Sequence, residues 1–356
     1  MELDVDTFLT VVYCVCDEVY QRELAPQLGP RRGARPALSD SEVLTLVVLE
    51  QWHGHRCERC FLRYVRHHWL AYFPRLTSQS AFNRRVRHLW AGLCVLGPAI
   101  ARAVSQLVGR MPTYQVWDGV PVPLMQQCRG ERHRLFGDEA SVGYGGSDRK
   151  EYYGMHLLAA ANDLGVIDGF MVGPAATSEY WLAEALLRWR QDPTAPAPTA
   201  KQVAPILGPT HQKGGQRVGP TGPLGPRLAA GGQAAQPATA RPVRPPILAD
   251  LGFTGRRWRA HWLAAYDSAV LTKADYDVLT NPTERKRFKR GFNSRRQDIE
   301  TIFSFLTDRF GIKFPRSRTH WGTWTRLAAK IAAFNLAVFI NYLFQRPPFS
   351  LFNPLN

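Results

Sequence analysis

Hydrophobic periodicity divides the chain into a helical first third and a mixed remainder. Through residues 1–110 apolar side chains recur at the three- and four-residue spacing of amphipathic helices. The segment 38–52, LSDSEVLTLVVLEQW, begins with the cap candidates Ser39 and Asp40 and continues with such a pattern. We therefore predict that this segment is a helix packed inside a small bundle.

A second helical signal lies in residues 78–93, SQSAFNRRVRHLWAGL, with Ser78 or Ser80 as its cap. Its apolar residues share one face, and the remaining surface carries Arg84, Arg85 and Arg87. A short basic helix after a helical pair can enter a DNA groove. The alternative is a solvated basic face on a helix that only packs.

From residue 113 the pattern changes to alternating and continuous apolar runs, which predict strands. Three candidates open a β-meander: 113–122, 150–161 and 166–173, with a turn in the sequence AANDLG between the last two. A helix is then predicted at 179–189, a strand at 246–253, a helix at 256–265 and mostly helix from 296 to 345. Intermingled strands and helices indicate an α/β fold.

Residues 192–246 have a different composition, with twelve prolines and eight glycines among 55 residues and no hydrophobic period. We interpret this segment as a flexible insertion. The predicted organisation is therefore a helical N-terminal region at 1–110, a catalytic α/β domain at 111–191 and 247–345, and the insertion at 192–246.

Charge is the feature of composition that changes this picture. The chain has 356 residues with 45 Lys plus Arg against 29 Asp plus Glu, which gives a net charge of +16. Such a balance predicts a polyanionic partner, with nucleic acid ahead of an anionic membrane surface. The most apolar stretch, 331–344, has only 14 residues and contains Asn335 and Asn341, so it fits a buried helix better than a membrane span.

Six unevenly spaced cysteines and an acidic N-terminus without a signal peptide favour reduced thiols in a cytosolic protein. The sequence HGHRCERC, with His53, His55, Cys57 and Cys60, superficially resembles a zinc site. Because it lacks a second spaced pair and places two candidate ligands within three residues, incidental spacing is the better interpretation.

Two acids interrupt apolar strands. Asp118 alternates with Val116 and Val120 in one predicted strand, and Asp250 interrupts the short apolar strand ILADLGF. An ionised carboxylate in such surroundings is costly unless it is paired, hydrogen-bonded or metal-bound. The pair suggests an oxygen-rich cation site, while the ordinary alternative is that each acid caps a turn or a helix.

A third acid, Glu300, lies in the predicted helix RRQDIETIFSFLTDRF at the edge of its buried stripe. Arg296, one turn earlier on the same side, can hold that carboxylate, form an ordinary surface ion pair with it, or bind a phosphate. Asp298 lies on the opposite flank and is the second candidate for the third acid.

A run of positive charge precedes Glu300. We call this set the basic run; it contains seven cations within residues 284–296: Arg285, Lys286, Arg287, Lys289, Arg290, Arg295 and Arg296. A solvated loop is one interpretation. Proximity to the candidate site favours phosphate contacts instead, with Arg287, Lys289, Arg290 and Arg296 as the expected DNA contacts.

In this order, VWDG, LADLGF and RRQDIETIFSFLTDRFGI resemble the DDE transposases of bacterial insertion sequences, and the resemblance covers most of the chain. Its strongest element is the spacing of Arg296 and Glu300. The resemblance implies an RNase H-like α/β domain with mixed sheet and flanking helices, preceded by a helical N-terminal domain, and an acidic triad at Asp118, Asp250 and Glu300. Where the family often has Lys after the second Asp, this chain has Leu251.

The resemblance further implies a DNA transposase that binds element ends, cuts the flanking DNA and joins the ends to a target. The triad is expected to hold two Mg²⁺ ions, with Mn²⁺ as a substitute. The expected partners are double-stranded DNA and a second copy of the chain, in the bacterial cytoplasm at the nucleoid and without a membrane. The alternatives are a purely hydrolytic RNase H-like nuclease and a catalytically inactive DNA-binding protein derived from a transposase.

Overall fold

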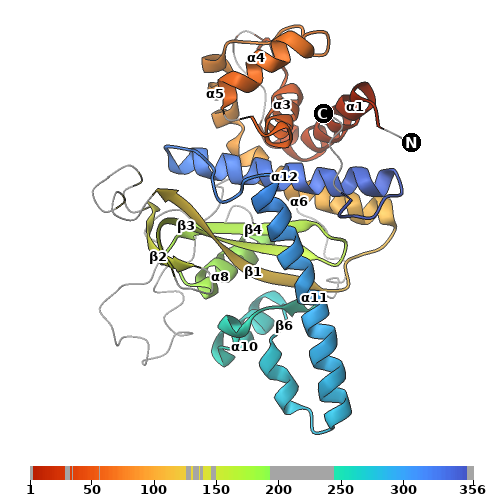
Figure 1. Cartoon of the computed structure of the whole chain (residues 1–356), viewed down its shortest axis with the longest axis vertical. Helices are drawn as coiled ribbons and strands as arrows, with labels where there is room; N and C mark the ends of the chain where they lie inside the picture. The colour runs from red at the N-terminus through yellow and green to blue at the C-terminus, as the bar shows by residue number, and fades with distance from the viewer. Residues whose placement is uncertain are drawn as a thin grey trace.

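The fold is taken from a computed structural model of the whole chain (Figure 1). It describes residues 3–28, 35–55, 57–125, 139–145, 150–192 and 244–350, with the isolated residues Gly33, Gly130 and Phe136. The insertion predicted at 192–246 therefore lies almost wholly outside the described residues, and so does Cys128.

The first third is helical, as predicted. Its helices are α1 (Val5–Val19), the π-helical turn η1 (Tyr20–Leu24), α2 (Ala25–Leu28), α3 (Asp40–His53), α4 (Glu58–His68), α5 (Gln79–His88) and α6 (Trp90–Val108). One of the two cap candidates is confirmed for each of the two helices. Ser39 caps α3 in a reciprocal capping box with Glu42, and the Ser78 hydroxyl accepts a hydrogen bond from the Ala81 amide at the start of α5.

Among the described residues, six strands form one mixed sheet: β1 (Gln115–Met125), β2 (Ser141–Gly145), β3 (Lys150–Asn162), β4 (Ile167–Pro174), β5 (Ile247–Leu248) and β6 (Val270–Leu271). The three predicted meander strands correspond to β1, β3 and β4. β3 pairs antiparallel with β1, β2 and β4, and β5 pairs parallel with both β1 and β6. The sheet order is β2-β3-β1-β5-β6, with β4 also on β3.

The strand predicted at 246–253 is wrong in its second half. β5 ends at Leu248, because Asp250 accepts a hydrogen bond from the Gly252 amide and turns the chain into the short 3-10 helix η4 (Leu251–Phe253). The apolar residues that follow are thus a buried helical turn, which a short apolar run does not distinguish from a strand.

The remaining helices are α8 (Glu179–Gln191), α10 (Arg256–Tyr266), the 3-10 helix η5 (Lys273–Val278), α11 (Pro282–Asp308) and α12 (His320–Leu343). α11 begins well before the predicted boundary, with Asn281 as its cap and Pro282 in its first turn. The basic run is consequently helical and belongs to the same helix as Glu300. Its first turns extend beyond the sheet, on the side away from the N-terminal helices (Figure 1).

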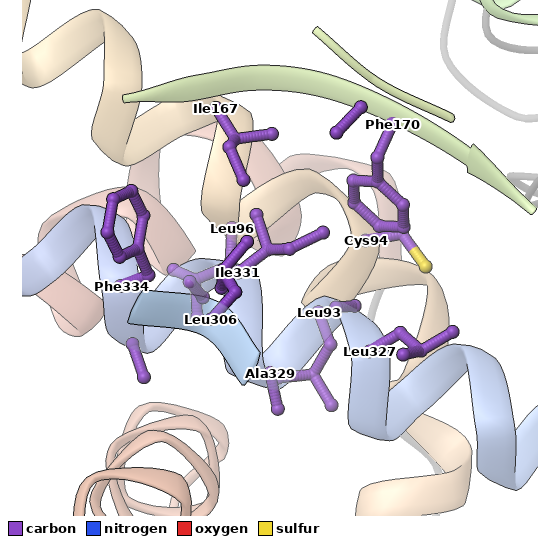
Figure 2. Packing of buried hydrophobic residues seen from close by; sticks show 14 of the residues in the cluster. Leu93, Cys94, Leu96, Ile167, Phe170, Leu306, Leu327, Ala329, Ile331 and Phe334 are labelled. Atoms are coloured by element: carbon purple, nitrogen blue, oxygen red, sulfur yellow. The ribbon is translucent and has the colours of Figure 1, made fainter. Parts of the chain in front are cut away.

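α6 and α12 lie between the N-terminal helices and the sheet (Figure 1). Figure 2 shows side chains of α6, β4, α11 and α12 packed together there, including Leu96, Ile167, Leu306 and Ile331. One hydrophobic cluster runs without interruption from α1 to α12. The helical region at 1–110 therefore shares its core with the α/β region.

Asn335 is a polar residue within this apolar layer, and hydrogen bonds to the backbone satisfy its side chain. Its Oδ1 accepts a hydrogen bond from the Ile167 amide at 2.9 Å, and its Nδ2 donates to the carbonyls of Ile167 at 2.7 Å and Gly97 at 2.8 Å. α6 and α12 are long and apolar enough to cross a membrane by length and composition, yet 61% and 78% of their apolar windows are buried within the fold. Such burial is typical of core helices in a soluble protein, as predicted for 331–344.

Candidate active site

The sheet places Asp118 and Asp250 side by side. β1 and β5 are parallel neighbours in which Gln115 pairs with Ile247 and Val116 with Leu248. Continued by two residues, this register brings Asp118 opposite Asp250, just beyond the carboxyl end of β5. Two carboxylates that are distant in sequence therefore lie near each other, with Asp250 just after the end of β5 but Asp118 within β1 rather than at a strand end.

Asp118 is held in a low-dielectric environment. Val116 and Val120, its neighbours on the same face of β1, are 1% and 4% exposed. Burial raises the pKa of Asp118, while the nearby Arg296 guanidinium and the Gly119 amide lower it and the charges of Asp250 and Glu300 raise it again. A partly buried acid close to two other acids is an arrangement that a divalent cation can neutralise.

α11 brings the third acid to the same place. Arg296 Nη2 lies 3.4 Å from Asp118 Oδ2, and Glu300, one turn later, is close enough for its charge to act on Asp118. The ion pair of Arg296 is therefore with Asp118 rather than the surface pair with Glu300 considered from sequence. Asp298 instead accepts a hydrogen bond from the Tyr114 hydroxyl at 2.9 Å, on the other flank of the helix.

The cap interpretation of Asp250 is also correct in part. Its Oδ1 accepts the Gly252 amide hydrogen at 2.8 Å and so caps η4. No hydrogen bond from the described residues reaches Oδ2. One carboxylate oxygen thus fixes the side chain while the other is available to a ligand.

Glu179, at the first position of α8, is a fourth acid that the sequence analysis missed. A Cβ added at Gly119 would lie 2.5 Å from Glu179 Oε1, and one added at Gly252 would lie 3.1 Å from Oε2. Burial, Asp250 and Asp118 raise the pKa of Glu179 to about 7. An acid in the first turn of a helix is an ordinary stabilising feature, so no local signal distinguished it.

His156 on β3 lies on the far side of Glu179 from Asp250. Its Nε2 is 3.5 Å from Glu179 Oε1, and burial lowers the pKa of His156 to about 4. The imidazole is therefore neutral at physiological pH. Arg296 is consequently the cation that offsets these acids, and the site carries an excess of negative charge when all four carboxylates are ionised.

The arginines of the basic helix α5 lie in two different environments. Arg84 and Arg87 are exposed, which is compatible with the predicted DNA contact. Arg85 is turned inward, where it forms an ion pair with the buried Asp40 and donates to the Leu38 carbonyl at 3.0 Å. Arg85 therefore anchors α5 on the start of α3, and the exposed basic surface of α5 rests on the other two arginines.

Within the basic run, Arg285, Lys286, Arg287, Lys289, Arg290 and Arg295 are exposed on the first half of α11. Lys289 lies over the Tyr276 ring at 6.0 Å, and Arg295 lies over the Tyr114 ring at 5.3 Å. Arg287 and Arg295 line a groove between α11 and the strands β5 and β6. A helical array of cations thus leads to Arg296 and the acids.

Across the described ranges, no three His, Cys, Asp or Glu side chains stand in an arrangement that could hold a metal ion. This applies to the HGHRCERC segment, where the His53 and His55 rings stack with centroids 4.2 Å apart and Cys57 and Cys60 contact each other. It applies equally to the acids around Asp118. Their carboxylate oxygens and their excess negative charge are nevertheless of the chemical kind that divalent cations such as Mg²⁺ bind.

Comparison with known proteins adds no relative. No protein-family model, no curated protein and no solved structure matches the chain.

Proposed function

We propose that the chain is a DNA transposase that binds the ends of its own element and catalyses metal-dependent DNA cleavage and strand transfer. The observation that carries this proposal is that three acids from separate parts of the chain, Asp118, Asp250 and Glu300, lie near one another. Beside them lies Arg296, whose guanidinium group is of the kind that binds phosphate. The mixed sheet with its flanking helices is compatible with an RNase H-like domain. The basic run and the charge of +16 supply the expected attraction to DNA.

Asp118, Asp250 and Glu300 would hold the cations, with Mg²⁺ favoured because all the donors are carboxylate oxygens. Divalent cations held there would supply activation of the attacking hydroxyl and stabilisation of the leaving oxygen, the chemistry that phosphoryl transfer to water or to a DNA 3′-hydroxyl needs. Arg296 holds the Asp118 carboxylate in position. The exposed cations of the basic run orient the phosphodiester backbone toward the acids.

DNA binding and chemistry are separate in this arrangement, which gives the proposal a sharp test. D118N, D250N and E300Q each remove one ligand without removing a cation from the DNA-binding surface. We expect each to abolish cleavage and joining while gel-shift affinity for the element ends stays within about threefold of the parent. E151Q, which neutralises an exposed acid on β3, is the control for the change in charge.

The DNA for this assay is the duplex that flanks the coding sequence and carries the terminal inverted repeat. Full cleavage by any one of the three variants would remove that residue from the site. Cleavage that survives E300Q but not D298N would assign the third role to Asp298. An active complex of two copies, working on DNA in the cytoplasm, completes the proposal and predicts one dimer bound to a pair of ends.

A further inference from the structure

Cys57 and Cys60, at the start of α4, are a pair of thiols that the proposed function does not use. Both side chains are exposed, and both cysteines are free. The Cys57 thiol donates to Cys60 Sγ across only 2.7 Å. Because a disulfide bond is about 2.05 Å long, the two sulfurs need to approach each other by less than about 1 Å to be joined.

The backbone at the start of the helix brings the two sulfurs together. Cys57 is the N-cap residue of α4 and has an extended backbone conformation, so its side chain folds back over the first turn. Its Sγ accepts a hydrogen bond from the Cys60 amide at 3.2 Å. The sulfur of residue 57 therefore lies over residue 60 without any rearrangement of the helix.

Glu58, one of the two residues between the cysteines, fixes this first turn in the fold. Its side chain is buried, and its carboxylate accepts hydrogen bonds from Gln79 Nε2 at 2.7 Å and from Asn83 Nδ2 at 3.1 Å. Both donors belong to α5. A turn that is tied to a neighbouring helix in this way loses little further freedom when a bond closes across it, so the geometry favours a bond between the two sulfurs.

The surroundings of Cys57 also favour attack by its thiolate. Hydrogen bonding with the Cys60 thiol and with the Cys60 amide lowers the pKa of Cys57 below its ordinary value, and the contact with Cys57 raises the pKa of Cys60. An exposed thiol of lowered pKa beside a second thiol is the arrangement of reactive C-x-x-C pairs, in which one sulfur attacks and the other resolves.

We propose that Cys57 and Cys60 are a redox-active dithiol that small-molecule disulfides oxidise reversibly. The Cys57 thiolate attacks one sulfur of the small disulfide, which gives a mixed disulfide on Cys57 and releases one small thiolate. Cys60 then attacks Cys57 Sγ as a thiolate, which forms the bond between Cys57 and Cys60 and releases the second small thiolate. Two protein thiols are thereby oxidised by two electrons in total. The small disulfide is reduced to two thiols, which take up the two protons.

The competing explanation is that Cys57 only caps α4. An acceptor that binds the first free amides of a helix serves the purpose that a hydroxyl serves in a serine cap. In that case the two cysteines react independently, and each keeps the small thiol that it acquires. The products of oxidation therefore separate the two explanations without reference to DNA or to catalysis.

The test is incubation of the full-length, reduced protein with oxidised glutathione, followed by alkylation of the remaining thiols, trypsin digestion and mass spectrometry. Trypsin cleaves after Arg59 and so separates the two cysteines, whereas a disulfide between them keeps the two peptides joined. We expect the parent to give the joined peptides and dithiothreitol to restore both thiols. C14S, which removes another exposed cysteine, should give the joined peptides as the parent does.

C60S isolates the first step, because the serine hydroxyl and the amide of residue 60 still reach the sulfur of Cys57. We expect this variant to stop at a lasting glutathione adduct on Cys57. The adduct should form roughly threefold faster or more than the adduct on the exposed Cys14, because a lowered pKa enlarges the thiolate fraction by more than it reduces the nucleophilicity of the thiolate.

A parent protein that keeps glutathione on either cysteine, without joined peptides, would overturn the inference. It would equally be overturned if Cys57 and Cys60 stayed unmodified under conditions in which Cys14 is modified. Circular dichroism confirms that C60S is folded, and the result with the parent decides the question if that variant does not fold.

Discussion

The hydrogen bonds of Asn335 in α12 predict that replacing this residue by leucine causes an unusually large loss of stability. Asn335 is fully buried in α12 and makes three hydrogen bonds of 2.7 to 2.9 Å to backbone groups of β4 and α6. N335L keeps the number and branching of the side-chain heavy atoms but leaves those backbone groups without these partners. A lost hydrogen bond costs about 1 kcal/mol, and a buried polar group left unsatisfied costs about 1–3 kcal/mol.

We therefore expect N335L to lower the free energy of unfolding by about 3–5 kcal/mol, a large share of the stability of a typical domain. Asn341, on the same helix, provides the matched control. Its Nδ2 donates a single hydrogen bond to the Pro348 carbonyl, at 2.9 Å, and its Oδ1 is buried with no partner among the described residues. N341L should accordingly cost only about 1 kcal/mol.

Urea unfolding followed by circular dichroism measures both variants, with the slope of the transition confirming that the same surface is exposed. A cost for N335L that is equal to or smaller than that of N341L would refute the reasoning. It would show that Asn335 does not hold α12 to β4 and α6.

Three further predictions concern charge and burial. Burial raises the pKa of Glu50 from 4.5 to about 7. E50Q should therefore be as stable as the parent below pH 4.5, become progressively more stable than the parent between pH 4.5 and 7, and exceed it by about 3 kcal/mol above pH 7. A stability difference that does not change with pH in denaturation curves would contradict this. Glu184 is buried and accepts hydrogen bonds from Trp262 at 3.0 Å and Tyr266 at 2.6 Å, so E184A should lower the melting temperature far more than E151Q in a thermal melt. Neutralising Arg287, Lys289 and Arg290 of the basic run should weaken binding to any duplex and reduce the slope of log affinity against log salt by about 0.9 per lost phosphate contact. Neutralising Arg84 and Arg87 should instead mainly reduce the preference for element ends over random duplex. The reverse pattern in a salt series would exchange the two roles.

The elements with strong local signals were predictable from sequence. Ser39 and Ser78 mark the starts of α3 and α5 because a hydroxyl followed by an apolar helical pattern satisfies the first free amides. The end of β5 was not predictable, since the turn depends on one hydrogen bond between Asp250 and Gly252. The short strands β2 and β6 leave little local pattern, since β2 has only five residues, two of them glycine, and β6 has only two residues, held by pairing with β5.

Some residues of the candidate site could likewise be proposed from sequence, and others could not. Asp118, Asp250 and Glu300 were identifiable because a charged residue within or beside an apolar stretch needs a physical reason. Glu179 was not identifiable, since only the parallel pairing of β1 with β5 and the lack of a side chain at Gly119 and Gly252 bring it to the other acids. Arg85 was assigned to DNA for its position in a basic helix, but its ion pair with Asp40 bridges 45 residues of sequence and has no local signature.

The central claim is tested most directly by following a labelled DNA 3′ end. A duplex that carries the terminal repeat, labelled at the strand to be transferred, is incubated with the full-length protein, supercoiled target DNA and Mg²⁺. We predict that the label becomes covalently joined to the target, that D118N abolishes this joining, and that E151Q does not. Release of the label by hydrolysis without joining would indicate a nuclease, and specific binding of the repeat with neither cleavage nor joining would contradict an enzymatic function.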